Sequence, residues 1–170
     1  QTQTPVGTEW DILNKEVWEL YRAGKYDSAT LIAQKALQVA EQNVGPDHTN
    51  VASSLNNLAN LYSDQGDYAK AEPLYKRSLA IREKALGPDH TDVAQSLNNL
   101  ALLYKKQGDY AKAESLYKRS LAILEKALGP DDHIVEFCLE NLAALYRATK
   151  RGEEAAVLEQ RAVKIRAIKR

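Results

Sequence analysis

The sequence lacks a charge excess, a pair of cysteines and a long apolar run, and each absence argues against a class of protein. Its 23 basic and 23 acidic residues balance, whereas proteins that bind duplex nucleic acid need a basic excess. No apolar run approaches the ~20 residues of a membrane-spanning helix. The sole cysteine, Cys138, has no partner for an internal disulfide, which fits a reducing compartment, although secreted proteins can also lack disulfides. We therefore expect a cytoplasmic protein that binds neither nucleic acid nor a membrane.

What the sequence does contain is a 42-residue stretch that occurs twice. Residues 49–90 and 91–132 differ at only eight positions and share SLNNLA-LY--QGDYAKAE-LYKRSLAI-EKALGPD. Such self-similarity is the signature of a stacked repeat protein. The same register continues on both sides, where Leu142 follows Leu100 and Gly24 precedes Gly66 by 42 residues. The sequence predicts a flexible lead-in over residues 1–8 and a single array over residues 9–170, with repeats at about 9–48, 49–90, 91–132 and 133–170.

Each repeat has the pattern of two helices, called A and B below. Apolar spacing predicts A helices over residues 49–64 and 91–106 and B helices over residues 68–86 and 110–128. We expect the first A helix to begin near Glu9, and Asp47 or Thr49 to cap the second. One pair cannot bury its own apolar faces, so the pairs must stack. The predicted fold is all-α, a right-handed superhelical solenoid of four antiparallel helix pairs.

Three short motifs carry a family resemblance. Leu-Ala-x-x-Tyr on the A helix, Gly-Asp-Tyr at the turn and Ala-x-x-x-Tyr on the B helix resemble the tetratricopeptide repeat (TPR). The 42-residue period, the long B helix and the SLNNLA segment resemble the kinesin light chain subfamily. This resemblance implies a protein–protein interaction scaffold whose A helices line a concave groove that binds peptides. The heptad segment that joins kinesin light chains to the motor is missing, so motor attachment is not implied.

The differences between the twin repeats indicate where a ligand would bind. Positions 53, 60, 63 and 64 and their counterparts form one stripe of the A helix, facing away from Leu58 and Tyr62. By resemblance, that stripe lines the groove, although drift on an exposed face is an alternative interpretation. In the same register the candidate groove residues are Asn14, Trp18, Tyr21, Arg22, Ser53, Asn56, Asn60, Ser63, Gln95, Asn98, Leu102, Lys105, Glu140 and Arg147.

These residue types predict the chemistry of the ligand. Asn56 and Asn98 offer both donors and acceptors to an extended peptide backbone. Trp18 is an apolar anchor with a polar tip, unless it packs against the second helix pair. The basic residues of the groove favour an acidic peptide, and the resemblance to kinesin light chains implies an acidic peptide with an aromatic anchor.

Features of an enzyme are missing from the sequence. It has no Gly-rich phosphate loop and no Ser-His-Asp order. His48, His90 and His133 lie in successive repeats, so we do not expect them to converge on a metal ion. Cys138 fits a buried core position. The sequence therefore predicts a non-catalytic scaffold without a cofactor or a metal.

The last helix leaves an alternative open. Apolar residues, among them Val157, Val163 and Ile168, spread around it between basic residues, whereas a terminal repeat should have a polar outer face. Either the full protein continues with another helix, or this end meets another copy; contact of this basic amphipathic helix with a membrane is a third, less favoured interpretation, because the helix would have to leave the stack. Self-association through this C-terminal helix would make the chain a structural or self-assembly module without a groove ligand.

Overall fold

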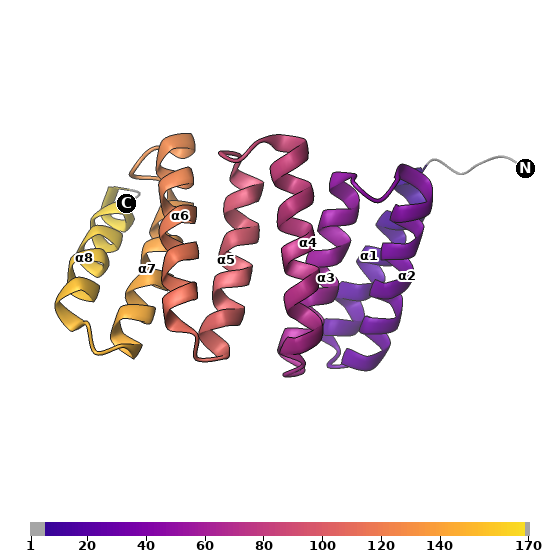
Figure 1. Ribbon diagram of the computed structural model, residues 1–170, viewed down its shortest axis with the longest axis horizontal. Helices are drawn as coiled ribbons and strands as arrows, with labels where there is room; N and C mark the ends of the chain where they lie inside the picture. Colours follow the sequence, from indigo (N-terminus) through magenta and orange to yellow (C-terminus); the bar gives the residue numbers. More distant parts are fainter. Residues whose placement is uncertain (1–5, 169–170) are drawn as a thin grey trace, which may run out of the picture. The chain divides into compact units, whose positions relative to one another are not determined.

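The computed structural model describes residues 6–168, which form eight α-helices and no strand (Figure 1). The helices are α1 (Val6–Arg22), α2 (Tyr26–Val44), α3 (Thr49–Asp64), α4 (Tyr68–Leu86), α5 (Thr91–Lys106), α6 (Tyr110–Leu128), α7 (His133–Ala148) and α8 (Gly152–Ile168). The predicted all-α fold of four helix pairs is confirmed, and α3 to α6 have the expected bounds. Most of the lead-in expected over residues 1–8 lies outside the described residues, and α1 already begins at Val6.

The chain divides into two compact units, residues 1–85 and residues 86–170. Helices α1 to α4 form the N-terminal unit, and α5 to α8 form the C-terminal unit (Figure 1). Each unit therefore contains one of the twin repeats and one of the more divergent outer repeats. The odd-numbered helices are the A helices, and the even-numbered ones are the B helices.

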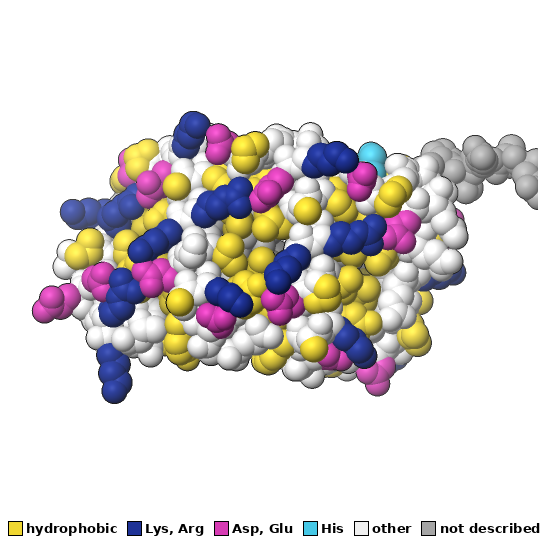
Figure 2. Space-filling model, in the orientation of Figure 1, with side chains coloured by type: hydrophobic (Ala, Val, Ile, Leu, Met, Phe, Trp, Pro, Cys, Tyr) yellow, Lys and Arg dark blue, Asp and Glu magenta, His cyan; other side chains and the backbone are white. Residues whose placement is uncertain are grey.

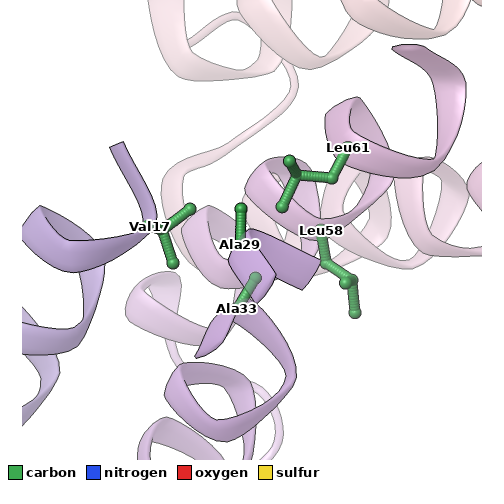
Figure 3. Packing of buried hydrophobic residues seen from close by; sticks show 5 residues of the cluster. All are labelled: Val17, Ala29, Ala33, Leu58 and Leu61. Atoms are coloured by element: carbon green, nitrogen blue, oxygen red, sulfur yellow. The ribbon is translucent and has the colours of Figure 1, made fainter. Parts of the chain in front are cut away.

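In the N-terminal unit, α2 packs between α1 and α3. Ala29 and Ala33 of α2 lie between Val17 of α1 and the leucines Leu58 and Leu61 of α3 (Figure 3). All five side chains are buried. The small alanine side chains let three helices approach closely, while the leucines fill the remaining space. This is the A–B–A contact that the apolar spacing of the repeat specifies.

In the C-terminal unit, α6 packs against α5 and α7 in the same way. Ala101 and Ala113 are fully buried, and the Ser120 hydroxyl donates to the Ala94 carbonyl over 2.9 Å. Cys138 of α7 is also fully buried, beside the Tyr117 carbonyl of α6 at 3.8 Å. Burial raises the pKa of the Cys138 thiol to about 11, so this residue is an uncharged part of the core at neutral pH, as expected.

The caps of the A helices differ from the expectation. His48 and His90, rather than Asp47 or Thr49, precede α3 and α5 in extended conformation, and each imidazole Nδ1 accepts a backbone N–H bond over 3.0 Å. Asp132 does the same for α7 over 2.8 Å. The prediction was wrong because it placed the cap by preferred residue type, and a neutral imidazole nitrogen accepts the same orphan N–H group.

The turns inside the repeats are alike except in the last repeat. Gly66 and Gly108 adopt left-handed backbone conformations, with φ of 79° and 80°. Lys150 takes the corresponding place in the fourth repeat with φ of 60°, the only non-glycine residue with positive φ in the described part of the chain. Its Cβ makes this conformation costly, so the last turn is strained relative to the others.

Candidate functional site

The fourteen predicted groove residues all lie on A helices, namely α1, α3, α5 and α7. Eight of them belong to the N-terminal unit and six to the C-terminal unit. The two sets are in different environments. On the face seen in Figure 2, basic and acidic side chains are interspersed among apolar ones, as expected for a solvated surface.

In α3, side chains expected to face a ligand are used in packing. Asn56 and Ser63 are each 5% exposed, so the expectation that they line an open groove is wrong. The Tyr75 hydroxyl of α4 donates to Asn60 and also bonds Ser63. Burial and the charge of Asp64 hold the pKa of Tyr75 well above its usual range. The helical rotation of 100° per residue placed these residues on one stripe of α3. It did not show that the buried side chain of Tyr75 reaches this stripe from the B helix.

In α1, the predicted aromatic anchors form an exposed cluster. Trp18 is 48% exposed, which excludes the alternative that it is packed away against the second helix pair. The ring centroids of Trp18 and Tyr21 lie 5.8 Å apart in an edge-to-face arrangement, and those of Tyr21 and Tyr26 of α2 lie 5.4 Å apart; Tyr26 was not among the predicted residues. The Tyr21 hydroxyl donates to Asp64 over 2.8 Å, and this bond raises the pKa of Tyr21. The cluster is therefore held against α3.

The remaining predicted residues of the N-terminal unit have fewer polar groups available for a ligand. The Asn14 amide donates to the Trp10 carbonyl over 2.9 Å and accepts from Asn57 over 3.3 Å. Ser53 is half-buried and donates to the Thr49 carbonyl over 3.3 Å. Arg22 is exposed at the end of α1. Most polar side chains along this face thus already have partners inside the unit.

The C-terminal unit has a hollow of about 390 Å³ between α5 and α7, called the α5–α7 hollow below. Its polar lining comes from α5 and includes Asp92, Gln95, Asn98 and Asn99. Its apolar lining consists of Leu124 of α6 and Ile134 and Phe137 of α7. A hollow that combines apolar walls with a few polar groups is the usual form of a ligand site.

Two residues of this hollow were missed, although the register could have identified one of them. Phe137 follows Gln95, and Ile134 follows Asp92, by one 42-residue period. Both side chains are exposed, Phe137 by 59% and Ile134 by 41%. Exposed aromatic and aliphatic side chains beside a hollow are costly to leave in water unless they meet a partner. Carrying the Gln95 position one period further would have added Phe137 to the candidate groove, whereas Ile134 follows Asp92, which was not a candidate.

Polar and charged side chains are distributed along α5 in the C-terminal unit. The Cys138 thiol lies 3.7 Å from the Asn98 carboxamide oxygen, to which it donates, and so orients that side chain. Leu102 is exposed, and Lys105 is half-buried near the other end of α5. Asp92 thus lies at one end of this face and Lys105 at the other.

Two predicted residues of α7 are engaged by α8. The Arg147 guanidinium makes a two-pronged ion pair with Glu159, at 2.9 and 2.7 Å, and this pair raises the pKa of Arg147. Glu140 pairs with Arg166, which also binds Glu136 at 2.7 Å. The positive charge of Arg147, expected to attract an acidic peptide, is therefore largely compensated inside the unit.

Within the described residues, no three His, Cys, Asp or Glu side chains are grouped as metal ligands. None of the eight helices has an apolar stretch long enough to cross a membrane, over the residues that the structure describes.

Comparison with known proteins decides the family. The family model of the tetratricopeptide repeat matches residues 20–84, 51–126 and 92–167. The chain belongs to the tetratricopeptide repeat family. Proteins with TPR folds are typically non-catalytic scaffolds that mediate protein–protein interaction, and no catalytic family is indicated. No curated protein sequence matches the chain.

Solved structures confirm the TPR-type solenoid fold and the likeness to kinesin light chain repeats. BtubC (BKLC) from P. vanneervenii is 26% identical with a TM-score of 0.88, and the match covers 99% of this chain and 67% of that one. A putative kinesin light chain from Podosopora anserina, with nearly identical TPR-like repeats, is 22% identical with a TM-score of 0.84. That match covers 98% of this chain and 78% of the other.

Proposed function

We propose that this TPR chain is a non-catalytic scaffold that binds an extended peptide of a partner protein in the α5–α7 hollow. The observation that carries the proposal is the hollow itself, where exposed Phe137 and Ile134 face polar side chains of α5. On the corresponding face of α3, Tyr75 engages Asn60 and Ser63, and Asn56 is buried, which favours the C-terminal unit as the binding site.

The side chains that line the hollow favour two features of a ligand, an apolar anchor side chain and a peptide backbone. A large apolar or aromatic side chain fits beside Phe137 and Ile134, over the buried Leu124. The carboxamides of Asn98 and Asn99 can donate to and accept from the peptide backbone at this anchor. The peptide is thus held by its main chain and selected by one anchor side chain.

Lys105 adds a preference for an acidic residue at a defined spacing. It lies ten residues beyond Gln95 on α5, which is about 15 Å along the helix axis. An extended peptide covers that distance in about four to five residues, at roughly 3.3 Å each. We therefore expect peptides with an apolar anchor and an acidic residue four to five positions away. Asp92, beside the anchor, disfavours a second acidic residue there.

Binding of display-selected peptides tests the proposal. Phe137→Ser removes the anchor contact, and because the side chain is exposed, the variant should fold normally. Leu31→Ser is the matched control, since Leu31 is an exposed apolar residue of α2 in the other unit. We expect Phe137→Ser to weaken peptide binding at least tenfold, or about 1.4 kcal/mol. The control variant should bind the peptide as tightly as the wild type. Equal affinities for both variants would contradict the proposal.

A structural or self-assembly module is the second candidate. Val157, Val163 and Ile168 of α8 are all more than half exposed, and together they supply apolar surface for contact with a second copy of the chain. Under this alternative, molecular mass would rise with concentration and no peptide would bind the α5–α7 hollow. Sedimentation equilibrium measures the first outcome directly.

A further inference from the structure

The Tyr117 side chain of α6 is buried, yet its hydroxyl group has no hydrogen-bond partner among the described residues. The residue is only 1% exposed, and burial raises the pKa of its hydroxyl to about 12, so the group is protonated and can donate at neutral pH. The hydroxyl oxygen is not fully enclosed, which means that it reaches the molecular surface. Buried tyrosines usually have a partner for this group, so a donor without one is available to a ligand.

The twin repeat indicates where this hydroxyl lies. Tyr75 occupies the same position one period earlier, and its hydroxyl donates to Asn60 and also bonds Ser63. Leu102 and Lys105 stand at the corresponding places on α5. The leucine side chain has no polar group, and the lysine ammonium can only donate. The hydroxyl from α6 therefore comes to the candidate groove stripe of α5 without the partners that its counterpart has.

Lys105 adds a positive charge beside this donor. Its side chain is half-buried, and no described residue forms an ion pair with it. Two other charged candidates of the C-terminal unit, Arg147 and Glu140, are each paired with a residue of α8. The hydroxyl and the ammonium are both donors, and an ionised carboxylate can accept from both of them. Hydrogen bonds to an ionised acceptor are about twice as strong as those between neutral groups, so a carboxylate is the favoured ligand.

We propose that the Tyr117 hydroxyl and the Lys105 ammonium together form a subsite that binds a side-chain carboxylate of the peptide. The subsite belongs to the peptide site proposed above and rests on that proposal. A lysine side chain is flexible and attracts an acidic residue at several positions. The buried ring of Tyr117, by contrast, fixes the place of its hydroxyl, which donates to one carboxylate oxygen while the ammonium binds the other. Tyr117 thus determines the position at which the peptide must carry its acidic residue.

The test compares two peptides on two forms of the chain. A display-selected peptide that contains an acidic residue is synthesised with glutamate and with glutamine at that position. Tyr117→Phe should weaken binding of the glutamate peptide about tenfold in fluorescence anisotropy, and should change binding of the glutamine peptide less than about twofold. Because the hydroxyl has no partner in the free chain, the variant should keep the Tm of the wild type. A role in packing alone would not produce this combination.

Two further variants make the outcome decisive. Tyr75→Phe removes the same group from the N-terminal unit and should leave peptide binding unchanged. Phe137→Ser tests the peptide site independently of the subsite. If Phe137→Ser weakens binding but Tyr117→Phe does not, or if Tyr117→Phe weakens both peptides equally, the carboxylate subsite is overturned and the peptide site stands. Unchanged binding to Phe137→Ser would overturn the peptide site, and the subsite with it.

Discussion

The twin repeats allow one hydroxyl group to be tested in two environments. Tyr75 and Tyr117 are equivalent and almost fully buried, at 3% and 1% exposure. The Tyr75 hydroxyl donates to Asn60 and bonds Ser63, whereas Leu102 and Lys105 stand at these places in the other repeat. We predict that Tyr75→Phe lowers the free energy of unfolding and that Tyr117→Phe leaves it nearly unchanged.

The magnitude follows from the hydrogen bonds that are lost. A typical buried hydrogen bond contributes about 1 kcal/mol, and an acceptor left unsatisfied costs about 1–3 kcal/mol. Asn60 is half-buried and can partly recover a bond to water, so we expect a loss of about 1–2 kcal/mol for Tyr75→Phe. Removing the Tyr117 hydroxyl breaks no comparable bond, and the expected change is close to zero.

Urea unfolding monitored by circular dichroism measures both variants under one condition. For a chain of this size, 1 kcal/mol corresponds to about 2–4 °C in Tm, so thermal melts provide a second measurement. The tyrosines have the same burial and the same backbone context, which makes each the control for the other. Equal losses in the two variants, or a larger loss for Tyr117→Phe, would refute the assignment of Asn60 and Ser63 to packing.

Three further predictions concern helix ends and ion pairs. Lys150→Gly should raise the free energy of unfolding by about 1 kcal/mol by removing the left-handed strain, whereas Lys150→Ala should not, as thermal melts would show. His90→Ala should cost about 0.5–2 kcal/mol in urea unfolding, and His90→Asp should retain the cap, as Asp132 does for α7. The bonds from Arg151 and then Lys118 hold the pKa of Glu114 at about 2, below its usual 4.5, so the ionised carboxylate stabilises the fold above that range. The stability gap between wild type and Glu114→Gln should therefore close as pH falls from about 4.5 to about 2; a gap that persists there would contradict the linkage.

Helix positions followed from the sequence because the twin repeats share their turn signals and packing alanines at a spacing of 42 residues. The bounds of α3 to α6 agree with the spacing of glycine, proline and apolar residues. Cap identity did not follow, because His48 competes with Asp47 and Thr49 for one place and only the backbone geometry shows which side chain accepts the N–H bond. Reasoning from residue type correctly predicted that a side chain caps the helix, but it named the wrong residue.

The candidate site was only partly predictable for a different reason. A helical stripe identifies side chains that share a face, but not whether a neighbouring helix covers them. Asn56 and Ser63 are covered, whereas Gln95 and Asn98 border a hollow. Phe137 was detectable by adding one period to Gln95, and it was missed because the candidate set was extended to α7 only through Glu140 and Arg147.

Chemical-shift mapping by NMR tests the central claim most directly. A selected peptide with an apolar anchor, and an acidic residue four to five positions away, is titrated into the isotope-labelled chain. We predict that the perturbed amide signals cluster in α5 and α7 around Gln95, Asn98 and Phe137, and that the Phe137→Ser variant loses them. Perturbations confined to α8 or to the N-terminal unit would contradict the α5–α7 hollow as the peptide site.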